Sequence, residues 1–226
     1  MRGFNFVSTL LTIISLFTMN VLSAQNDGIN LAENKEAFSK LIFYDYRGTN
    51  AADAALGTAI MNGDYQNPLF EFYFKAGYKR FLSDHFNIGF SFNKYNLAFE
   101  DVYDEGFMSF DVNIEYLLYP YKRWSPFIAG GYGFNASNYF NSTSTKVQGA
   151  IGIEYIVYGQ LGLKLFGEYN YNFGDELDGL EAGASDDVFY RIGFGVNVYF
   201  GGKKQKQKRL SEIKTVIKSR PITIEE

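Results

Sequence analysis

Apolar and polar positions alternate without a break over the thirteen residues Val188–Phe200, VFYRIGFGVNVYF. One set of alternate positions is wholly apolar or aromatic, and the other is rich in small and polar residues and carries one charge, Arg191. Successive side chains of a strand point to opposite faces, so this pattern predicts a β-strand with one apolar face. Its length exceeds the usual soluble strand of about 5–6 residues and suffices for a tilted membrane-spanning strand, which needs roughly 9–11.

The same alternation recurs in the preceding sequence and predicts seven further strands. Residues 51–61 give the weakest pattern because they are mostly small, and residues 41–46 are the alternative first strand. Residues 127–138 are rich in glycine, which leaves their two faces unassigned. The remaining predicted strands are residues 69–81, 86–93, 107–119, 146–157 and 161–173.

The predicted connections alternate in length along the chain. Three are short, near residues 83–84, 120–125 and 158–160, and the intervening ones, at 62–68, 100–106, 137–145 and 174–187, are longer. Short periplasmic turns and longer extracellular loops are typical of outer-membrane barrels. We therefore predict an all-β fold, an eight-stranded antiparallel transmembrane β-barrel over residues 51–200. The alternative is a soluble β-sandwich or lipocalin-like barrel, but isolated charges among Gly, Asn and Ser favour a narrow packed lumen.

The segments that flank the predicted barrel have different compositions. Residues 1–24 combine Arg2, an apolar stretch and small residues up to Ala24, which predicts a cleaved signal peptide; a single membrane anchor is the alternative. Residues 25–50 are polar and irregular and are interpreted as a periplasmic lead-in. Residues 201–226 are interpreted as a short basic periplasmic tail, with a short helix near residues 210–217.

Composition and charge agree with this division. The chain has 18 Tyr, 23 Phe and 23 Gly but no Cys, which favours a β-rich membrane barrel and excludes disulfides and Cys-ligated metals. Residues 25–200 carry 12 basic and 22 acidic side chains, a net charge of −10, whereas residues 201–226 carry 8 and 3, a net charge of +5. The basic tail is therefore a segment of its own.

The charged residues on the polar faces of the strands are the first candidates for a site. An eight-stranded barrel is just wide enough for its interior to fill with side chains, and buried charges need partners. We expect a lumen charge network rather than a conducting path, in which Arg191 holds two carboxylates at once. Its predicted members are Glu71, Lys75, Glu115, Glu154, Lys164, Glu168 and Arg191, with Lys79 and Asp111 on the same faces.

Other candidates lie outside the lumen. Four aromatic residues are predicted to anchor the barrel at the membrane interface: Tyr119, Tyr121, Trp124 and Phe200. The predicted long loops are acidic, which allows cation binding, but without an EF-hand spacing a solvated exterior is the simpler interpretation. The single His, His85, lies at a short turn, so acyl-transfer chemistry lacks its general base. We expect no enzyme, no cofactor and no metal.

Residues 51–200 resemble the small outer-membrane β-barrel family of the OmpA-type and opacity-like kind. The resemblance rests on FKAGYKRFLSDHFNIGFSF, SPFIAGGYGFNAS and YRIGFGVNVYF. More narrowly, TKVQGAIGIEYIVYGQLGLKLFGEYNYNF, DELDGL and NVYFGG are similar to the barrel region attached to some curli secretion-channel homologues, although the channel domain itself is not in this sequence. The family resemblance implies that the aromatic end of the last strand, Phe200, contacts the assembly machinery.

The sequence therefore predicts an exported protein of the cell outer membrane with a structural or interaction role. Outer-membrane lipid, the outer-membrane assembly machinery, and envelope or secretion proteins are the expected partners, and no nucleic acid. The alternatives are a narrow pore or accessory component of a curli-type secretion channel, and a soluble ligand-binding barrel.

Overall fold

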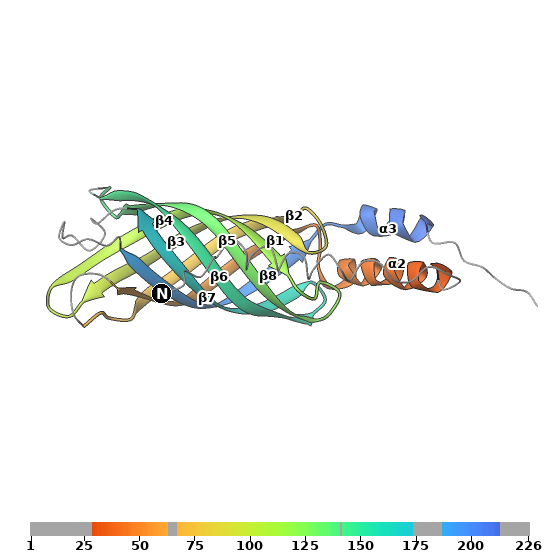
Figure 1. The fold of residues 1–226 in the computed structure, drawn as a ribbon, viewed down its shortest axis with the longest axis horizontal. Coiled ribbons are helices and arrows are strands. Elements are labelled where there is room, and N and C mark those ends of the chain that lie inside the picture. The colour runs from red at the N-terminus through yellow and green to blue at the C-terminus, as the bar shows by residue number, and fades with distance from the viewer. Residues whose placement is uncertain (1–28, 63–66, 141, 174–186, 213–226) are drawn as a thin grey trace, which may run out of the picture. The chain divides into compact units, whose positions relative to one another are not determined.

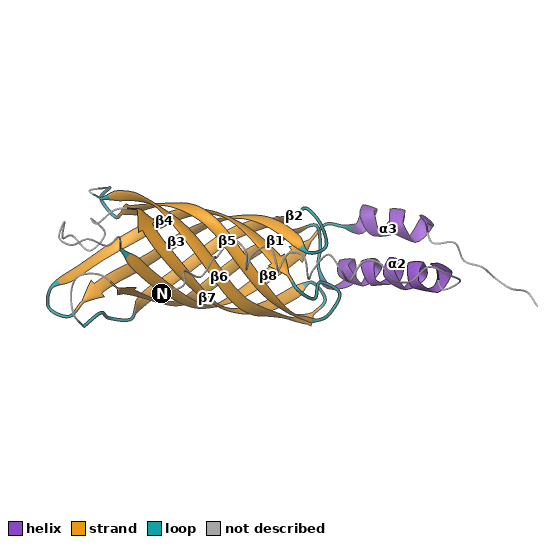
Figure 2. Cartoon of the chain, in the orientation of Figure 1, coloured by secondary structure: helices purple, strands orange, loops and turns teal. Residues whose placement is uncertain are grey.

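The eight predicted strands form one closed antiparallel barrel in which each strand pairs with its neighbours in sequence and β1 pairs with β8 (Figures 1 and 2). The computed structural model describes residues 29–62, 67–140, 142–173 and 187–212. The strands are β1 Asn50–Asn62, β2 Glu71–Phe81, β3 Phe86–Phe99, β4 Tyr103–Leu117, β5 Trp124–Ser137, β6 Thr143–Tyr158, β7 Leu161–Phe173 and β8 Val188–Phe200. The predicted fold is confirmed.

Closure of the barrel depends on β1, the strand with the weakest sequence pattern. All thirteen residues of β1 pair with β8, from Asn50 opposite Phe200 to Asn62 opposite Val188. Small side chains here do not prevent pairing, because the ladder uses backbone groups. Residues 51–61 are thus the first strand, and the alternative at residues 41–46 is wrong.

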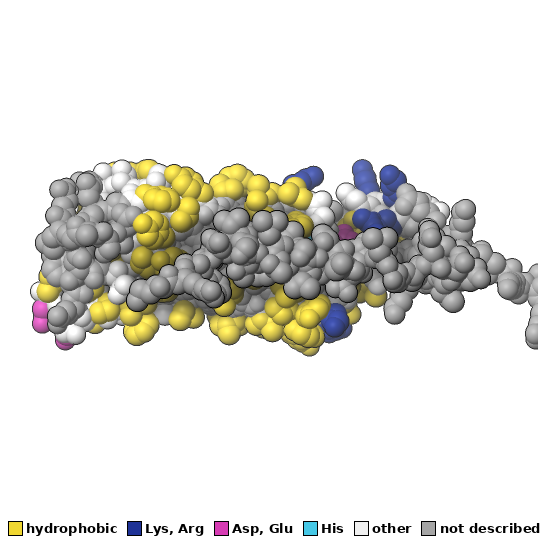
Figure 3. Space-filling model, in the orientation of Figure 1, with side chains coloured by type: hydrophobic (Ala, Val, Ile, Leu, Met, Phe, Trp, Pro, Cys, Tyr) yellow, Lys and Arg dark blue, Asp and Glu magenta, His cyan; other side chains and the backbone are white. Residues whose placement is uncertain are grey.

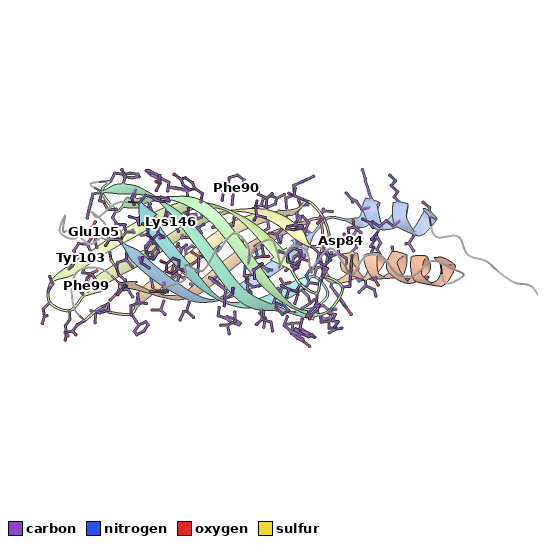
Figure 4. All side chains as sticks on the ribbon, viewed as in Figure 1. Asp84, Phe90, Phe99, Tyr103, Glu105 and Lys146 are labelled. Atoms are coloured by element: carbon purple, nitrogen blue, oxygen red, sulfur yellow. The ribbon has the colours of Figure 1, made fainter. Side chains whose placement is uncertain are left out.

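The two faces of each strand differ as the alternation predicts. Large apolar side chains such as Phe72, Phe90 and Ile151 are 60%, 61% and 69% exposed on the outside. Their sequence neighbours point into the lumen and are buried or partly buried. Figure 3 shows the resulting apolar flank of the barrel, and Figure 4 shows Phe90 on it. An apolar exterior over a polar interior is the arrangement of a membrane barrel and the reverse of a soluble one.

Along the chain, one helix precedes the barrel strands, α2 (Ile29–Tyr46), and one follows them, α3 (Lys203–Glu212). The first corrects the prediction that residues 25–50 are irregular: no Pro or Gly lies between Gly28 and Gly48, and a helix forms there without clean amphipathic periodicity. The second begins directly after the glycine pair at 201–202, earlier than the predicted helix near residues 210–217. None of the described helices is long and apolar enough to cross a membrane.

The connection between β3 and β4 is shorter than predicted. The ladder continues until Phe99 pairs with Tyr103, so only residues 100–102 form the turn. Leu97, Phe99 and Phe107 are buried on the inside of this extension, and pairing the strands removes these apolar side chains from water. Asp104 and Glu105 therefore lie in β4 and not in a loop, at the opposite end of the barrel from Asp84 (Figure 4).

One glycine of β8 gives room to an aromatic ring of the neighbouring strand. A Cβ at Gly193 would lie 2.6 Å from Cζ of Phe166, whose ring is buried in the lumen. We expect Gly193→Ala to lower the free energy of unfolding by about 1–3 kcal/mol, because the ring must shift in a packed core. Gly167→Ala is the matched control, since a Cβ at Gly167 meets nothing within 4 Å. Equal urea midpoints for the two variants would contradict this packing argument.

Candidate functional site

The charged lumen is the candidate site, and Arg191 of β8 lies at the centre of its first cluster. The Arg191 side chain is fully buried, its Nε donates to Glu168 Oε1 at 3.0 Å, and its Nη2 donates to Asp111 Oδ2 at 3.0 Å. Lys146 Nζ lies 3.0 Å from the same Asp111 oxygen. Two cations and two carboxylates from four strands therefore form one neutral cluster, with Arg191 holding both carboxylates.

Aromatic rings surround this cluster. The Arg191 guanidinium carbon lies 4.9 Å from the ring centre of Tyr73 and 5.3 Å from that of Tyr95. Tyr95 in turn stacks on Phe189, with ring centres 5.2 Å apart. Cation–π contacts of this kind strengthen when water is excluded, so the aromatic rings stabilise the charge and fill the space around it.

A second cluster is centred on Glu115 of β4. One of its carboxylate oxygens, Oε2, lies 2.9 Å from Lys79 Nζ and 3.0 Å from Lys164 Nζ. Asn87 donates to the other oxygen at 3.0 Å. Lys164 also lies 4.3 Å from the ring centre of Phe127. This carboxylate bridges two lysines from β2 and β7 across the width of the lumen.

Of the three remaining predicted members of the network, Glu154 belongs to a third charged site, and no described ion pair brings Lys75 or Glu71 into these clusters. Lys75 is buried in the lumen, with its Nζ 5.6 Å from the ring centre of Phe166. Glu71 lies at the first position of β2 and is only partly buried; its backbone carbonyl accepts from Thr58 Oγ1 at 3.0 Å. Lys75 also lines a cavity of about 30 Å³ with Asp53, Lys79 and Glu115, which is room for one or two waters.

A third charged site lies at the short-turn end of the barrel, which we define by the turns at residues 82–85, 118–123 and 159–160. Arg47, one residue beyond α2, is fully buried there. Its Nε and Nη2 donate to Glu154 Oε2 at 3.0 and 2.8 Å. Its Nη1 donates to the carbonyls of Pro120 at 2.7 Å and Lys122 at 3.0 Å. Arg47 therefore ties the chain before β1 to β6 and to the β4–β5 turn.

The other oxygen of Glu154 is also engaged. Asn197 Nδ2 donates to Glu154 Oε1 at 2.6 Å, and the Tyr199 hydroxyl donates to the same atom. Burial alone would lower the pKa of Arg47. The adjacent Glu154 and the Tyr199 hydroxyl raise it by more than burial lowers it, so the net pKa lies above the ordinary value. Arg47 is therefore charged at every physiological pH.

Apolar contacts hold the segment that carries Arg47. Phe43 is buried, and its ring centre lies 5.3 Å from that of Phe81 at the end of β2. Phe81 contacts Tyr199, with ring centres 6.0 Å apart. The backbone N–H of Arg47 donates to the Phe43 carbonyl at 2.7 Å, which continues the helical hydrogen bonding past Tyr46. Residues 43–47 thus cover the short-turn end of the lumen.

Apolar side chains gather toward the long-loop end of the lumen, among buried polar residues that include Asn93, Asn135 and Asn172. Met61, Leu97, Phe99 and Phe107 are buried there and belong to one apolar cluster that also contains Phe189. A lumen filled by packed aromatic and aliphatic side chains excludes water. The charged clusters are therefore bounded by apolar packing on one side and by the Arg47 segment on the other.

The four predicted interfacial aromatic residues differ in exposure. Tyr119, Trp124 and Phe200 are 41%, 43% and 44% exposed at the short-turn end, and the Tyr119 and Trp124 rings meet edge to face at 5.1 Å. Tyr121 instead is partly buried, and its hydroxyl donates to Asp84 at 3.0 Å. His85, at the same end, lies 2.7 Å from the Leu117 carbonyl through Nδ1 and stacks on Tyr116.

The acidic residues assigned to the long loops are only partly within the described structure. Glu100 and Asp101 are exposed at the β3–β4 turn, whereas Asp187 is buried. Among the described residues, no group of three or more acidic or His side chains has the arrangement of a metal site. The remaining acidic loop residues lie outside the described ranges: Asp64, Asp175, Glu176, Asp178, Glu181 and Asp186.

No protein-family model and no curated protein sequence matches the chain. Among solved structures, Neisserial surface protein A matches with a TM-score of 0.57 at 15% identity, over 68% of this chain and 98% of that one. The N-terminal β-barrel domain of Pseudomonas aeruginosa OprF matches with a TM-score of 0.42 at 16% identity, over 67% and 98%. The outer membrane enzyme PagL matches with a TM-score of 0.43 at 12% identity, over 66% and 99%.

The likeness to Neisserial surface protein A establishes the fold. This chain has the fold of the small eight-stranded outer-membrane β-barrels. The fold and the apolar exterior together indicate an outer-membrane location in contact with lipid, as the sequence predicts. The broad resemblance is therefore confirmed at the level of the fold, while the narrower likeness to curli-associated barrels and the expectation of no enzymatic activity stay predictions.

Proposed function

We propose that this protein is a structural and interaction barrel of the outer membrane whose lumen does not conduct ions. The observation that carries the proposal is the balance of buried charge. Among the described residues, six acidic and six basic side chains are buried. Isolated buried ions are costly and paired ones are tolerated, so a balanced and largely paired set suits a packed interior.

The ends of the lumen support the same proposal. The Arg47 segment covers one end, and apolar side chains such as Met61, Leu97, Phe99 and Phe107 pack toward the other. The described cavity between the charge clusters has room for one or two waters only. In this role the barrel is a membrane scaffold with acidic residues at the long-loop end and a basic helix at the short-turn end.

The expected result in a planar bilayer is the near absence of current through the wild-type protein. The refolded full-length chain would be compared with a porin of known conductance in the same lipid. A packed eight-stranded barrel leaves no water path for ions. The two alternatives, a narrow pore and an accessory component of a secretion channel, differ in this measurement: only the pore passes current.

Replacing a lysine of the lumen distinguishes conductance through a genuine pore from conductance through the lipid or a contaminant. If the wild type gave steady steps of conductance, and Lys164→Gln changed their ion selectivity, the lumen would be the pathway and the proposal would be overturned. Steps that Lys164→Gln leaves unchanged would be assigned to the lipid or to a contaminant. A soluble ligand-binding barrel is tested separately, because it would be recovered from cells without detergent.

A further inference from the structure

We infer that a ring of basic side chains at the short-turn end binds the head groups of anionic phospholipids. This basic collar comprises Arg80, Lys122, Arg123, Lys203, Lys204 and Lys208. All six residues are exposed, and Figure 3 shows Lys and Arg side chains gathered at the end from which α3 extends. The inference concerns the outside of the barrel and does not depend on whether the lumen conducts.

The collar comes from separate elements that the fold brings to the short-turn end of the barrel. Arg80 lies one residue before the end of β2, and Lys122 and Arg123 lie in the turn between β4 and β5. The three lysines are on α3, which begins three residues after Phe200 ends β8. Positive charge is therefore spread around the barrel rather than confined to one compact patch, which suits the lipid head groups that surround a membrane-spanning barrel.

The acidic residues at this end are already engaged by other cations. Asp45 forms an ion pair with Lys206. Asp84 lies 3.9 Å from Arg209, whose guanidinium also lies 5.7 Å from the ring centre of Tyr44. These contacts fix the inner side of α3 and leave its other lysines directed outward. Among the described carboxylates, none forms an ion pair with a collar residue.

Interfacial aromatic residues set the collar at the level of the lipid head groups. Lys122 Nζ lies 4.6 Å from the ring centre of Tyr119 and 5.7 Å from that of Trp124. Arg80 shares Asn50 Oδ1 with the hydroxyl of Tyr78. Exposed Trp and Tyr side chains mark the membrane–water interface. Lys and Arg beside them reach the phosphates of the same leaflet, which attract basic segments electrostatically.

This arrangement favours a lipid surface over an acidic protein partner. A protein would contact one side of the barrel, whereas collar residues lie on both the β1–β2 side and the β4–β5 side. The opposite end exposes Glu100 and Asp101 instead, so the affinity for anionic lipid belongs to one leaflet. In outer-membrane barrels the short-turn end is the periplasmic one.

Trp124 is the only Trp in the chain and lies within the collar, which makes it a local reporter. The full-length protein would be reconstituted in phosphatidylcholine vesicles that contain a small, equal fraction of bromine-labelled phosphatidylglycerol or bromine-labelled phosphatidylcholine. We expect the anionic lipid to associate with the collar at least about threefold more strongly, measured by Trp124 quenching, and this preference to fall in high salt.

Two variants test whether the collar causes the preference. Replacing the whole collar (Arg80→Gln, Lys122→Gln, Arg123→Gln, Lys203→Gln, Lys204→Gln and Lys208→Gln) removes the positive charge beside Trp124 as well as that on α3. We expect this sixfold variant to lose at least half of the preference, taken as the ratio of quenching by the two lipids within the variant. Lys94→Gln is the control, because Lys94 lies near the long-loop end, away from the collar, where its Nζ donates a hydrogen bond to Asn138. Migration of the unheated protein as a compact band in gels confirms that each variant is folded.

Three results would overturn the inference. Equal quenching of the wild type by both lipids would show that the collar has no preference for anionic head groups. A preference that persists in the sixfold variant would assign the effect to another part of the barrel. Binding of a soluble acidic polypeptide to the reconstituted wild type, without any lipid preference, would assign the collar to an acidic protein partner.

Discussion

Replacing Arg191 with alanine is expected to lower the free energy of unfolding by about 3–5 kcal/mol, since it leaves buried carboxylates without their partner. The cluster of Arg191, Lys146, Asp111 and Glu168 is neutral in the wild type and would carry one uncompensated negative charge in the variant. The guanidinium also lies against Tyr73 and Tyr95. Its removal therefore takes away packing as well as charge.

The measurement is urea-induced unfolding in detergent micelles, followed by Trp124 fluorescence and by the gel mobility of unheated samples. Arg80→Ala is the matched control, because Arg80 is exposed, and we expect a change below about 0.5 kcal/mol. The double variant Arg191→Met with Glu168→Gln restores neutrality and should recover part of the loss. An unchanged unfolding midpoint in Arg191→Ala would rule out a stabilising role for this ion cluster.

The fold could be read from the sequence because each strand repeats the same two-residue period. In β8 that period is strict, and it identifies Arg191 as a lumen residue before any partner is known. In β5 the glycines obscure it, since a residue without a side chain belongs to neither face. The structure assigns Phe127 and Asn135 to the buried face of β5 and Tyr132 to the exposed one.

The extension of β3 and β4 beyond the predicted barrel could not be read in this way. Asp104, Glu105 and Gly106 have the composition of a loop, but their backbone groups complete a ladder that buries Leu97 and Phe107. Tertiary burial outweighs the local preference of three residues. The predicted acidic loop at this position therefore shortens to residues 100–102.

The composition of the lumen could be predicted better than its pairing. Strand parity places Glu115, Glu154 and Lys164 inside, but partners depend on the stagger between strands far apart in sequence. The predicted network does not include Lys146, although its parity places it inside, opposite Asn172 of β7. Arg47 gave no strand signal at all, because it lies outside the barrel strands, and only the fold brings it to Glu154, 107 residues away.

Replacing Arg47 with alanine is expected to lower the free energy of unfolding by about 3 kcal/mol, the lower end of the range for breaking a buried pair. Glu154 keeps the donors Asn197 and Tyr199 in this variant, which limits the loss. The carbonyls of Pro120 and Lys122 lose their donor, so the segment before β1 is held by its apolar contacts alone. Trypsin cleavage at Lys40 should then become faster while the barrel remains folded.

A double-mutant cycle separates the ion pair from the contacts to the two carbonyls. Glu154→Gln keeps the shape of the side chain but removes its charge and replaces one acceptor oxygen by an NH2 donor, and we expect a coupling free energy with Arg47→Ala of about 1–3 kcal/mol. Arg123→Ala is the control at the same end, because Arg123 contacts the Tyr46 ring at 5.6 Å and is exposed. If Arg47→Ala and Arg123→Ala gave the same stability and the same cleavage rate, the segment would be held by Phe43 and not by Arg47.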